Sequence, residues 1–485
     1  MQQKITIAQA IELALQHHRA GRLDDAEAAY KNILAHVPDS PDALHLLGVL
    51  ASQRGRPDIA VTLVERAIAL KPETPEFHFN LGGIYQAAGK FQESITHTRR
   101  AIELQPETPG AYANLGLSLS EIGRLDEAMD ALNKAVERQP DRPGVHLDLG
   151  NVHWKMGRHE LALASFRRAI RIDPGNPALH WSCARVLLQL GRLSEGWEEF
   201  EWRVRFTQMR LDRGFTQPQW DGSDPAGKTI LLHTEGGLGD AVNFVRLVPM
   251  ATRHGGRFVL ECQPTLISLF QGIPGVDQLV ARGQPLPPFD YHLPLQGLPR
   301  ILGITLQNIP NQVPYLTAPK DRAVSFAERT LNDGKLRVGL VWCGVMYNEA
   351  DFRSRTLDIF HPLMKLPGIR FFSLQKGDAS AEIPPPDTDW VDFSNELKDF
   401  SDTAALVSIM DLVISVDTSV AHLAGALAKP VWVLIPTQSD FRWLLDRTDS
   451  PWYPTMRLFR QRQGDDWSKT IEDMTKSLSE FPRPA

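Results

Sequence analysis

The sequence predicts a multidomain protein in which an all-helical repeat superhelix precedes an α/β region made of two parallel-sheet halves. Glycine, proline and small residues recur at one fixed step through the first two hundred residues. From about residue 228, short apolar runs alternate with helical patterns, which is typical of parallel sheets. At 485 residues the chain is too long for one compact core, so two or three domains are expected.

The repeat covers residues 1–205. A step of 34 residues separates Gly21 from Gly55 and Gly55 from Gly89, and proline and small residues keep the same step. This period, with small residues on both helices of each unit, is typical of tetratricopeptide repeats. Gly would end the first helix and Pro would close the loop after the second. The series are Gly21, Gly55, Gly89, Gly123, Gly157, Gly191; Pro38, Pro72, Pro106, Pro140, Pro174; Gly48, Gly82, Gly116, Gly150, Ala184; and Ala26, Ala60, Ser94, Ala128, Ala162, Gly196.

Polar residues recur at one position of these repeats. Asn80 and Asn114 both precede Leu-Gly, Asp148 is next in the series, and Leu46 breaks it in the second repeat. The pattern resembles the asparagine ladder of O-linked N-acetylglucosamine transferases, which grips an extended peptide; an amide can both donate to and accept from a peptide unit. Two interpretations remain open: a peptide clamp in the concave groove, or solvated polar residues on a helix.

Composition excludes several classes of function. The net charge of -6 is spread along the chain without a basic tract, so nucleic acid is not an expected partner. Cys183, Cys262 and Cys343 lie far apart, without the spacing of metal ligands, so no metal is expected. No apolar run is long enough to cross a bilayer, and the N-terminus does not have the pattern of a signal peptide. We expect a cytoplasmic protein.

The first α/β half is predicted over residues 228–330, after a linker at 206–227. Strand Thr229–His233 leads into a glycine loop that contains Gly236, Gly237 and Gly239 and ends in Asp240. The loop fits neither the P-loop nor the Gly-x-Gly-x-x-Gly pattern. Asp240 is either a catalytic carboxylate at the mouth of the sheet or a cap of the following helix.

The second half is predicted over residues 331–485. Its first strand runs into Gly344, and the loop that follows carries Arg353 and Arg355, which could clamp phosphate or be surface charge. Gln375 and Lys376 follow the next strand, at the edge that faces the ligand in a doubly wound sheet. Asp387-Thr388-Asp389 has the form of a metal-binding Asp-x-Asp, but its neighbouring prolines indicate a loop.

A turn in this half is the strongest candidate for binding an anion. The apolar run Leu412–Val416 ends in Asp417, Thr418 and Ser419, and a short helix of small residues that includes His422 follows. A strand, a polar turn and a helix place free backbone N–H groups at the carboxyl edge of a sheet, where phosphate binds. Trp443 follows as a candidate contact to base or sugar, with packing as the alternative.

Two such halves facing each other imply a cleft, which is the GT-B arrangement of two Rossmann-like domains. The chain resembles the bacterial tetratricopeptide-fused glycosyltransferases, whose catalytic part resembles the family 9 heptosyltransferases; some are flagellin glycosyltransferases. The Asp417–Gly425 run is the most specific match and the Gly-Leu-Gly-Asp loop is the next. The other segments are Val338–Gly344, 353–355, 373–377 and 443–454.

The resemblance implies roles for these residues. Asp240 would be the general base. Asp417, Thr418 and His422 would bind the donor pyrophosphate, and either Arg353 or Arg355 would supply a cation. No cofactor or metal is implied.

We therefore predict an inverting glycosyltransferase that moves a sugar from a nucleotide sugar to a Ser or Thr hydroxyl of a protein held by the repeats. Flagellin is the acceptor suggested by analogy alone. Two alternatives stay open: a non-catalytic tetratricopeptide scaffold with a module that binds sugar nucleotides, and a glycosyltransferase that acts on a surface glycan.

Overall fold

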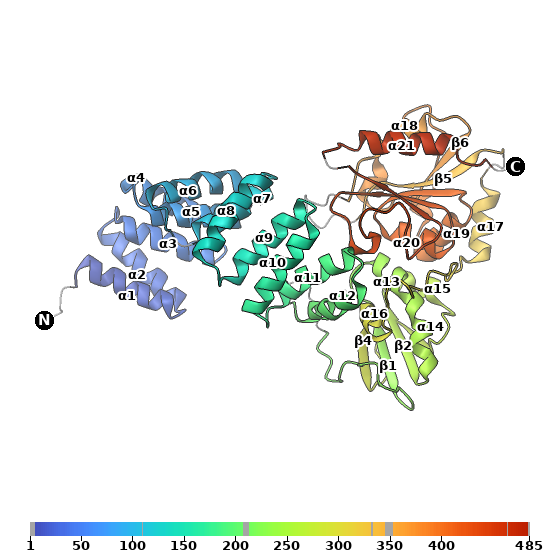
Figure 1. Ribbon diagram of the computed structural model, residues 1–485, viewed down its shortest axis with the longest axis horizontal. Helices are drawn as coiled ribbons and strands as arrows, with labels where there is room; N and C mark the ends of the chain where they lie inside the picture. Colours follow the sequence, from blue (N-terminus) through green and yellow to red (C-terminus); the bar gives the residue numbers. More distant parts are fainter. Residues whose placement is uncertain are drawn as a thin grey trace. The chain divides into compact units, whose positions relative to one another are not determined.

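The computed structural model describes residues 5–108, 110–206, 213–330, 333–344, 353–462 and 464–483. It forms two compact units, Met1–Leu179 and His180–Ala485, which are described separately. Figure 1 labels their elements along the chain.

The first unit is built from antiparallel helix pairs. The first helix of most pairs begins with proline, which suits the first helical turn because its N–H has no partner there. Each first helix ends at a glycine with positive φ, for example +70° at Gly55 and +78° at Gly123. The helices are α1 Ile7–Arg19, α2 Leu23–His36, α3 Pro41–Gln53, α4 Pro57–Leu70, α5 Pro75–Ala87, α6 Phe91–Leu104, α7 Ala111–Glu121, α8 Leu125–Arg138, α9 Pro143–Lys155 and α10 His159–Ile172.

Small residues hold the two helices of a pair together, as the sequence predicted. A methyl group at Gly48 would lie 2.6 Å from Val64 Cγ2, and one at Gly150 would lie 2.4 Å from the ring of Phe166. Ala60 and Ala162, on the second helices, are fully buried. The prediction of a tetratricopeptide-type helical array is therefore confirmed.

The second unit begins with one more helix pair, α11 (Pro177–Gln189) and α12 (Leu193–Phe200), and the short helix η1 (Glu201–Arg205). This pair packs on the α/β elements: Trp197 donates from Nε1 to Ile304 O at 3.0 Å, and its ring contacts Phe244 and Phe441. The compact units consequently divide in the first turn of α11, between Leu179 and His180, whereas the sequence placed a domain boundary at residue 205. The aromatic residues of the last repeat explain the difference.

The first sheet is four-stranded, parallel and ordered β3-β2-β1-β4. Ile230 and Phe258 pack with the helices on one face, and Leu231 and Val259 alternate to the other face. Phe215, from the predicted linker, is partly buried and packs on that second face, so this part of the linker contacts the core. The elements are β1 Thr229–His233, α13 Leu238–Phe244, α14 Val248–Ala251, β2 Arg257–Cys262, α15 Ile267–Phe270, β3 Gln278–Ala281, β4 Tyr291–Pro294 and α16 Leu298–Ile301.

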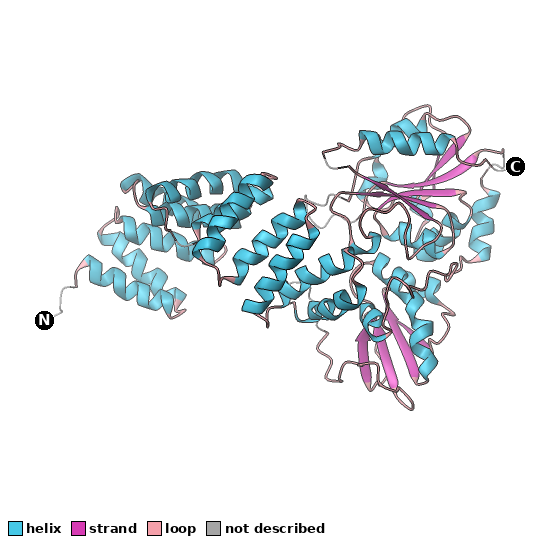
Figure 2. Cartoon of the chain, in the orientation of Figure 1, coloured by secondary structure: helices cyan, strands magenta, loops and turns pink. Residues whose placement is uncertain are grey.

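The second sheet is six-stranded, parallel and ordered β10-β9-β8-β5-β6-β7. Figure 2 shows helices on both of its faces: α18 and α21 share a core on one face, and α19 and α20 pack on the other. The elements are α17 Lys320–Glu328, β5 Leu336–Val341, α18 His361–Met364, β6 Ile369–Ser373, β7 Trp390–Asp392, α19 Phe400–Ser408, β8 Leu412–Val416, α20 Ser419–Ala426, β9 Val431–Ile435, β10 Met456–Arg460 and α21 Ser468–Ser479.

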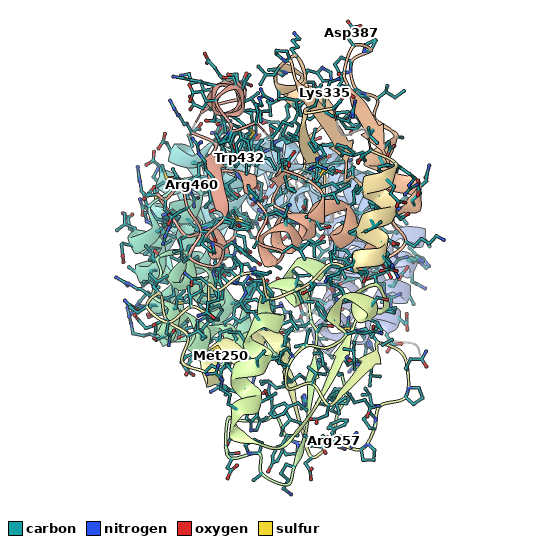
Figure 3. All side chains as sticks on the ribbon, turned by 90° about the vertical axis from the view of Figure 1, so that its right-hand side faces the viewer. Met250, Arg257, Lys335, Asp387, Trp432 and Arg460 are labelled. Carbon is teal, nitrogen blue, oxygen red and sulfur yellow. The ribbon has the colours of Figure 1, made fainter. Side chains whose placement is uncertain are left out.

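Parallel α/β structure after the repeats is thus confirmed, and the GT-B pairing of the two halves remains a prediction. The Asp-x-Asp motif lies in a turn, as expected. Asp387 is exposed at the outer surface (Figure 3), and Asp389 is paired with Lys335 at 2.7 Å and with Arg370 at 2.9 Å. No helix in the described part of the chain is long and apolar enough to cross a membrane.

Candidate functional site

A cavity of about 940 Å³ opens at the carboxyl edge of the second sheet. The ends of β5 and β6 and the start of α20 line it, and Leu238 joins them from the first half. Six of the predicted site residues are in this lining. They are Gly344, Arg355, Gln375, Lys376, Thr418 and Ser419.

The start of α20 offers backbone donors to this cavity. Thr418 is the N-cap, in extended conformation, and its side chain makes no capping bond; its Oγ1 lies 2.9 Å from Ser415 Oγ instead. The first N–H groups of a helix have no partner within the helix, and the helix dipole favours negative charge there. Because Ser419 and Val420 line the cavity, an anion can reach these groups.

The structure distinguishes the two candidate arginines. Arg355 lines the cavity, and its guanidinium lies 4.6 Å from the centre of the Trp467 ring. Burial raises the pKa of Asp240 and of Asp417, and the charge of Arg353 is among those that oppose the rise, so Arg353 lies near both carboxylates. Arg355 is therefore the better candidate for contacting a bound phosphate. The residues between Gly344 and Arg353 lie outside the described part of the chain.

Gln375 and Lys376 shape the cavity through bonds to the backbone. Gln375 accepts from the N–H groups of Trp342 and Cys343 at 3.1 and 2.9 Å and donates to two carbonyls. Lys376 donates from Nζ to Ser394 O at 2.7 Å. The Gln375 amide therefore holds the loop after β5, where the sequence suggested a contact to the donor.

The glycine loop of the first half presents Asp240 at the third position of α13. Gly236 has φ +68°, and a methyl group there would lie 2.4 Å from Asp240 Oδ2, so only glycine fits. The N–H of Gly237 donates to Asp240 Oδ2 at 2.7 Å. Asp240 does cap the helix, as one of its two predicted roles required, yet a quarter of its side chain stays exposed.

Helices α13 and α20 meet at Gly239, which brings the two predicted motifs together. A methyl group at Gly239 would lie 2.9 Å from His422 Cδ2 and 3.3 Å from Ser419 Cα. His422 is buried, stacks on Trp443 with the ring centres 5.1 Å apart, and shares a 3.0 Å hydrogen bond between its Nδ1 and Tyr453 Oη.

His422 and Trp443 consequently lie outside the cavity lining, whereas the sequence placed both at the donor. His422 faces α13, where Gly239 has no side chain and so leaves room for the imidazole ring. Burial lowers its pKa well below the usual value, so the ring is neutral.

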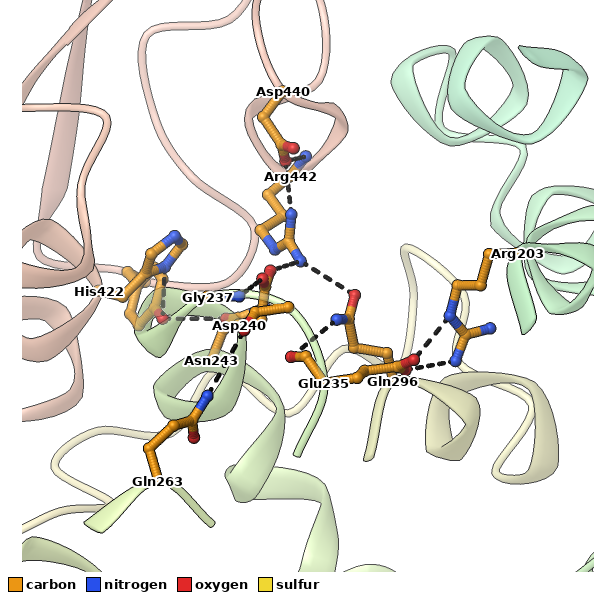
Figure 4. A network of polar contacts seen from close by, with 12 residues as sticks. Arg203, Glu235, Gly237, Asp240, Asn243, Gln263, Gln296, His422, Asp440 and Arg442 are labelled. Atoms are coloured by element: carbon orange, nitrogen blue, oxygen red, sulfur yellow. Dashed lines mark hydrogen bonds and ion pairs between the residues drawn. The ribbon is translucent and has the colours of Figure 1, made fainter. Parts of the chain in front are cut away.

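Arg442 is the residue that sequence reasoning missed. It is almost fully buried and donates to carboxylate oxygens of Asp240 and Asp440, the latter at 2.8 Å (Figure 4). The network continues through Gln296 to the Glu235 carbonyl, and the Glu235 carboxylate pairs with Arg203. No motif marks Arg442; only the fold brings it to Asp240 from the other half.

The carboxylates of this network are poorly solvated. Burial raises the pKa of Asp240, and the charge of Arg442 opposes that rise. Burial, with the nearby charge of Asp440, raises the pKa of Asp417 to about 6. Asp417 lies behind the turn, outside the cavity lining. Among the residues that the structure describes, no group of His, Cys, Asp or Glu is arranged to hold a metal ion.

The three predicted peptide-binding residues occupy matching positions of α5, α7 and α9 in the helical unit. Asn80 Nδ2 lies 2.7 Å from His45 Nε2, and Asn114 and Asp148 are half-buried. Burial raises the pKa of Asp148 to about 7, so this residue of the series changes charge near neutral pH. The structure places the residues in register and leaves the peptide clamp a prediction.

Comparison with known proteins supports the repeats, and one sequence match extends past the helical unit. Two family models, both described as tetratricopeptide repeat, match residues 17–81 and residues 74–141 and 111–175. Protein FlbA of Caulobacter vibrioides is 30% identical over 321 residues, which cover 60% of this chain and 53% of FlbA. The chain spans about half the length of this curated relative. Since 60% of the chain exceeds the helical unit, the match extends into the second unit.

Solved structures similar to the chain include MamA, which is 25% identical and matches with a TM-score of 0.31, covering 33% of this chain and 94% of MamA. A thermophilic tetratricopeptide protein of Thermus thermophilus is 23% identical, with a TM-score of 0.33, over 38% of this chain and all of that protein. Scores this low support no structural argument.

Proposed function

We propose that the chain is a glycosyltransferase, in which the two α/β halves form a GT-B pair and the cavity at α20 takes a nucleotide sugar. One observation carries this proposal. The carboxylate of the glycine loop and the start of α20 belong to different halves, yet a methyl group at Gly239 would lie only 3.3 Å from Ser419 Cα. Asp240 itself is not in the cavity lining, but Leu238, two residues before it, is. A base close to a phosphate site is what glycosyl transfer requires.

The acceptor would be a Ser or Thr hydroxyl of a protein held by the helical repeats. Asp240 takes the proton of that hydroxyl, whose oxygen forms a bond to the anomeric carbon as the bond from this carbon to the diphosphate oxygen breaks. The nucleoside diphosphate leaves with the electron pair, and the configuration at the anomeric carbon inverts. Attack by the hydroxyl from the face opposite the diphosphate gives this inversion.

Charge on the leaving diphosphate is stabilised by groups that are already in place. The residues at the start of α20, with their N–H groups, and Arg355 line the cavity. Fixed donors of this kind act strongly in a partly dry site because they need no reorganisation. The side chains of Leu238 and Phe400, which line the cavity and are partly exposed, offer an apolar surface for the nucleoside.

Peptide binding without catalysis is the second candidate, because the family models match only within residues 17–175. Each repeat array of this kind presents a long groove to a partner. The resemblance suggests flagellin as the acceptor of the enzyme, and a scaffold would bind a peptide of similar extended form. Binding of a nucleotide by the second unit separates these two candidates.

The test is calorimetric titration of the whole chain with UDP, ADP, GDP and CMP. Ser419→Pro removes the N–H at the first position of α20, where proline is tolerated and the extended Thr418 is compatible with it. Ser419→Ala is the matched control, because it removes the hydroxyl and keeps the N–H. We expect one nucleotide to bind, with affinity about tenfold lower in Ser419→Pro and nearly unchanged in Ser419→Ala. If none of the nucleotides bound, the scaffold would be favoured.

A further inference from the structure

Arg442 lies in the segment between β9 and β10 of the second half, yet its guanidinium contacts a side chain of the first half. Its exposed side-chain fraction is 7%, and Asp240 is one of the two carboxylates it meets. We propose that Arg442 is the positioning residue for Asp240, which it holds against the glycine loop in the orientation that accepts a proton. The inference rests on the proposed role of Asp240 as the general base.

The two oxygens of Asp240 are held by different donors. Oδ2 accepts from the Gly237 N–H, and Oδ1 accepts from Arg442. An ionised carboxylate has about four acceptor positions, so two bonds fix its plane and leave positions for an acceptor hydroxyl. The exposed quarter of the side chain gives that hydroxyl access.

Arg442 is itself fixed from several sides. Asp440 accepts from both its side chain and its backbone N–H, at 2.8 and 2.9 Å. Its guanidinium lies 4.3 Å from the centre of the Phe441 ring and 5.1 Å from that of Phe244, so it is also packed between aromatic rings of both halves. A guanidinium held in this way has a defined direction.

Helices α11 and η1, near the start of the second unit, support both partners of this contact. Gln189 donates from Nε2 to Ser439 O at 2.6 Å, close to Arg442 in the chain. Arg203 pairs with Glu235, which precedes the glycine loop. Helix α11 therefore braces the segment that carries Arg442, and η1 braces the loop that carries Asp240, as Figure 4 shows for Arg203.

The charges around Asp240 give the inference a pH signature. Arg442 and Arg353 lower its pKa, whereas burial and the charge of Asp440 raise it; Glu235 lies near as a further carboxylate, and His422 is neutral. Loss of Arg442 would therefore raise the pKa of Asp240. Its ionised form, which acts as base, would then be lost at a higher pH, and the acid limb of kcat/KM would move upwards.

Arg442→Gln tests this, with Arg246→Gln as the matched control. Arg246 is equally buried and also bridges the halves, bonding Trp452 O at 2.5 Å and Tyr315 Oη at 2.7 Å. Among the described residues it donates to backbone carbonyls and this hydroxyl rather than to a carboxylate. We expect Arg442→Gln to lower kcat about 10- to 100-fold with little change in donor KM and to move the acid limb upwards. Arg442→Lys should recover part of the loss, and Arg246→Gln should leave the acid limb in place.

Unchanged or faster turnover in Arg442→Gln, or equal shifts of the acid limb in both variants, would overturn the inference. Hydrogen exchange of peptides over residues 234–241 gives a second reading that needs no activity. Arg442→Gln should speed exchange there, and unchanged exchange would also overturn the inference. If exchange were faster in Arg442→Gln but the wild-type protein transferred no sugar, the contact between Arg442 and the glycine loop would be supported and the proposed function rejected.

Discussion

Replacing Gly239 by alanine should loosen the junction between the two α/β halves. The added methyl group would lie 2.9 Å from His422 Cδ2 and 3.3 Å from Ser419 Cα. The ring cannot easily retreat, because it stacks on Trp443 and shares a hydrogen bond with Tyr453. Overpacking of a tight core costs about 1–3 kcal/mol. Gly239 lies in the first turn of α13, so the helix preference of alanine recovers only a small part of this cost.

Hydrogen exchange measures this cost locally. At about 1.4 kcal/mol per tenfold change, peptides over α13 and α20 should exchange roughly 5- to 150-fold faster in Gly239→Ala than in the wild type. Gly237→Ser is the control, because the new Cβ would lie 3.6 Å from Asp240 Oδ2, an ordinary contact. The effect should shrink when His422→Ala is added, since the clashing ring is then absent. Wild-type exchange in Gly239→Ala would refute the close packing of the two helices.

Three further predictions concern the repeats and the cavity. Asp148→Asn should stabilise the helical unit relative to wild type, because the folded pKa of Asp148 is raised to about 7 and its ionisation therefore costs stability. The gain in the free energy of unfolding should grow from about pH 4 to pH 7 and stay constant above pH 7, and urea unfolding across pH measures it. Gly123→Ala, at φ +78°, should cost about 1 kcal/mol, whereas Gly144→Ala, in open space on α9, should be neutral or stabilising in the same unfolding assay. Arg355→Gln should weaken nucleotide binding about 10- to 100-fold by calorimetry, and Arg353→Gln should weaken it less.

The sequence predicted those parts of the fold that follow strong periodic patterns. The 34-residue repeat, the buried strands and the glycine after the first helix of each repeat are all present in the structure. Strands β4 and β10 were not predicted, because both lie at sheet edges and carry polar residues such as His292 and Arg457 among their apolar ones. Such strands owe their form to a neighbouring strand, which a local pattern does not contain.

In the candidate site, too, features set by a local pattern were predicted and features set by tertiary contacts were not. The glycine loop and the α20 turn were placed correctly at sheet edges, because a strand followed by a helix fixes where the turn lies. The face that His422 presents was misjudged, since it depends on how closely Gly239 allows α13 to approach. Arg442 was missed because its relation to Asp240 spans 202 residues and leaves no local spacing to recognise.

Release of nucleoside diphosphate from the sugar nucleotide that binds is the most direct measurement of the central claim. The wild-type chain and Asp240→Asn would be compared at saturating donor, with a Ser- or Thr-containing acceptor protein followed by intact mass. We predict that the wild type adds one sugar mass per modified hydroxyl. Asp240→Asn should release nucleotide about 10²- to 10⁴-fold more slowly at unchanged donor affinity. Equal release by both proteins would contradict the role of Asp240 as base.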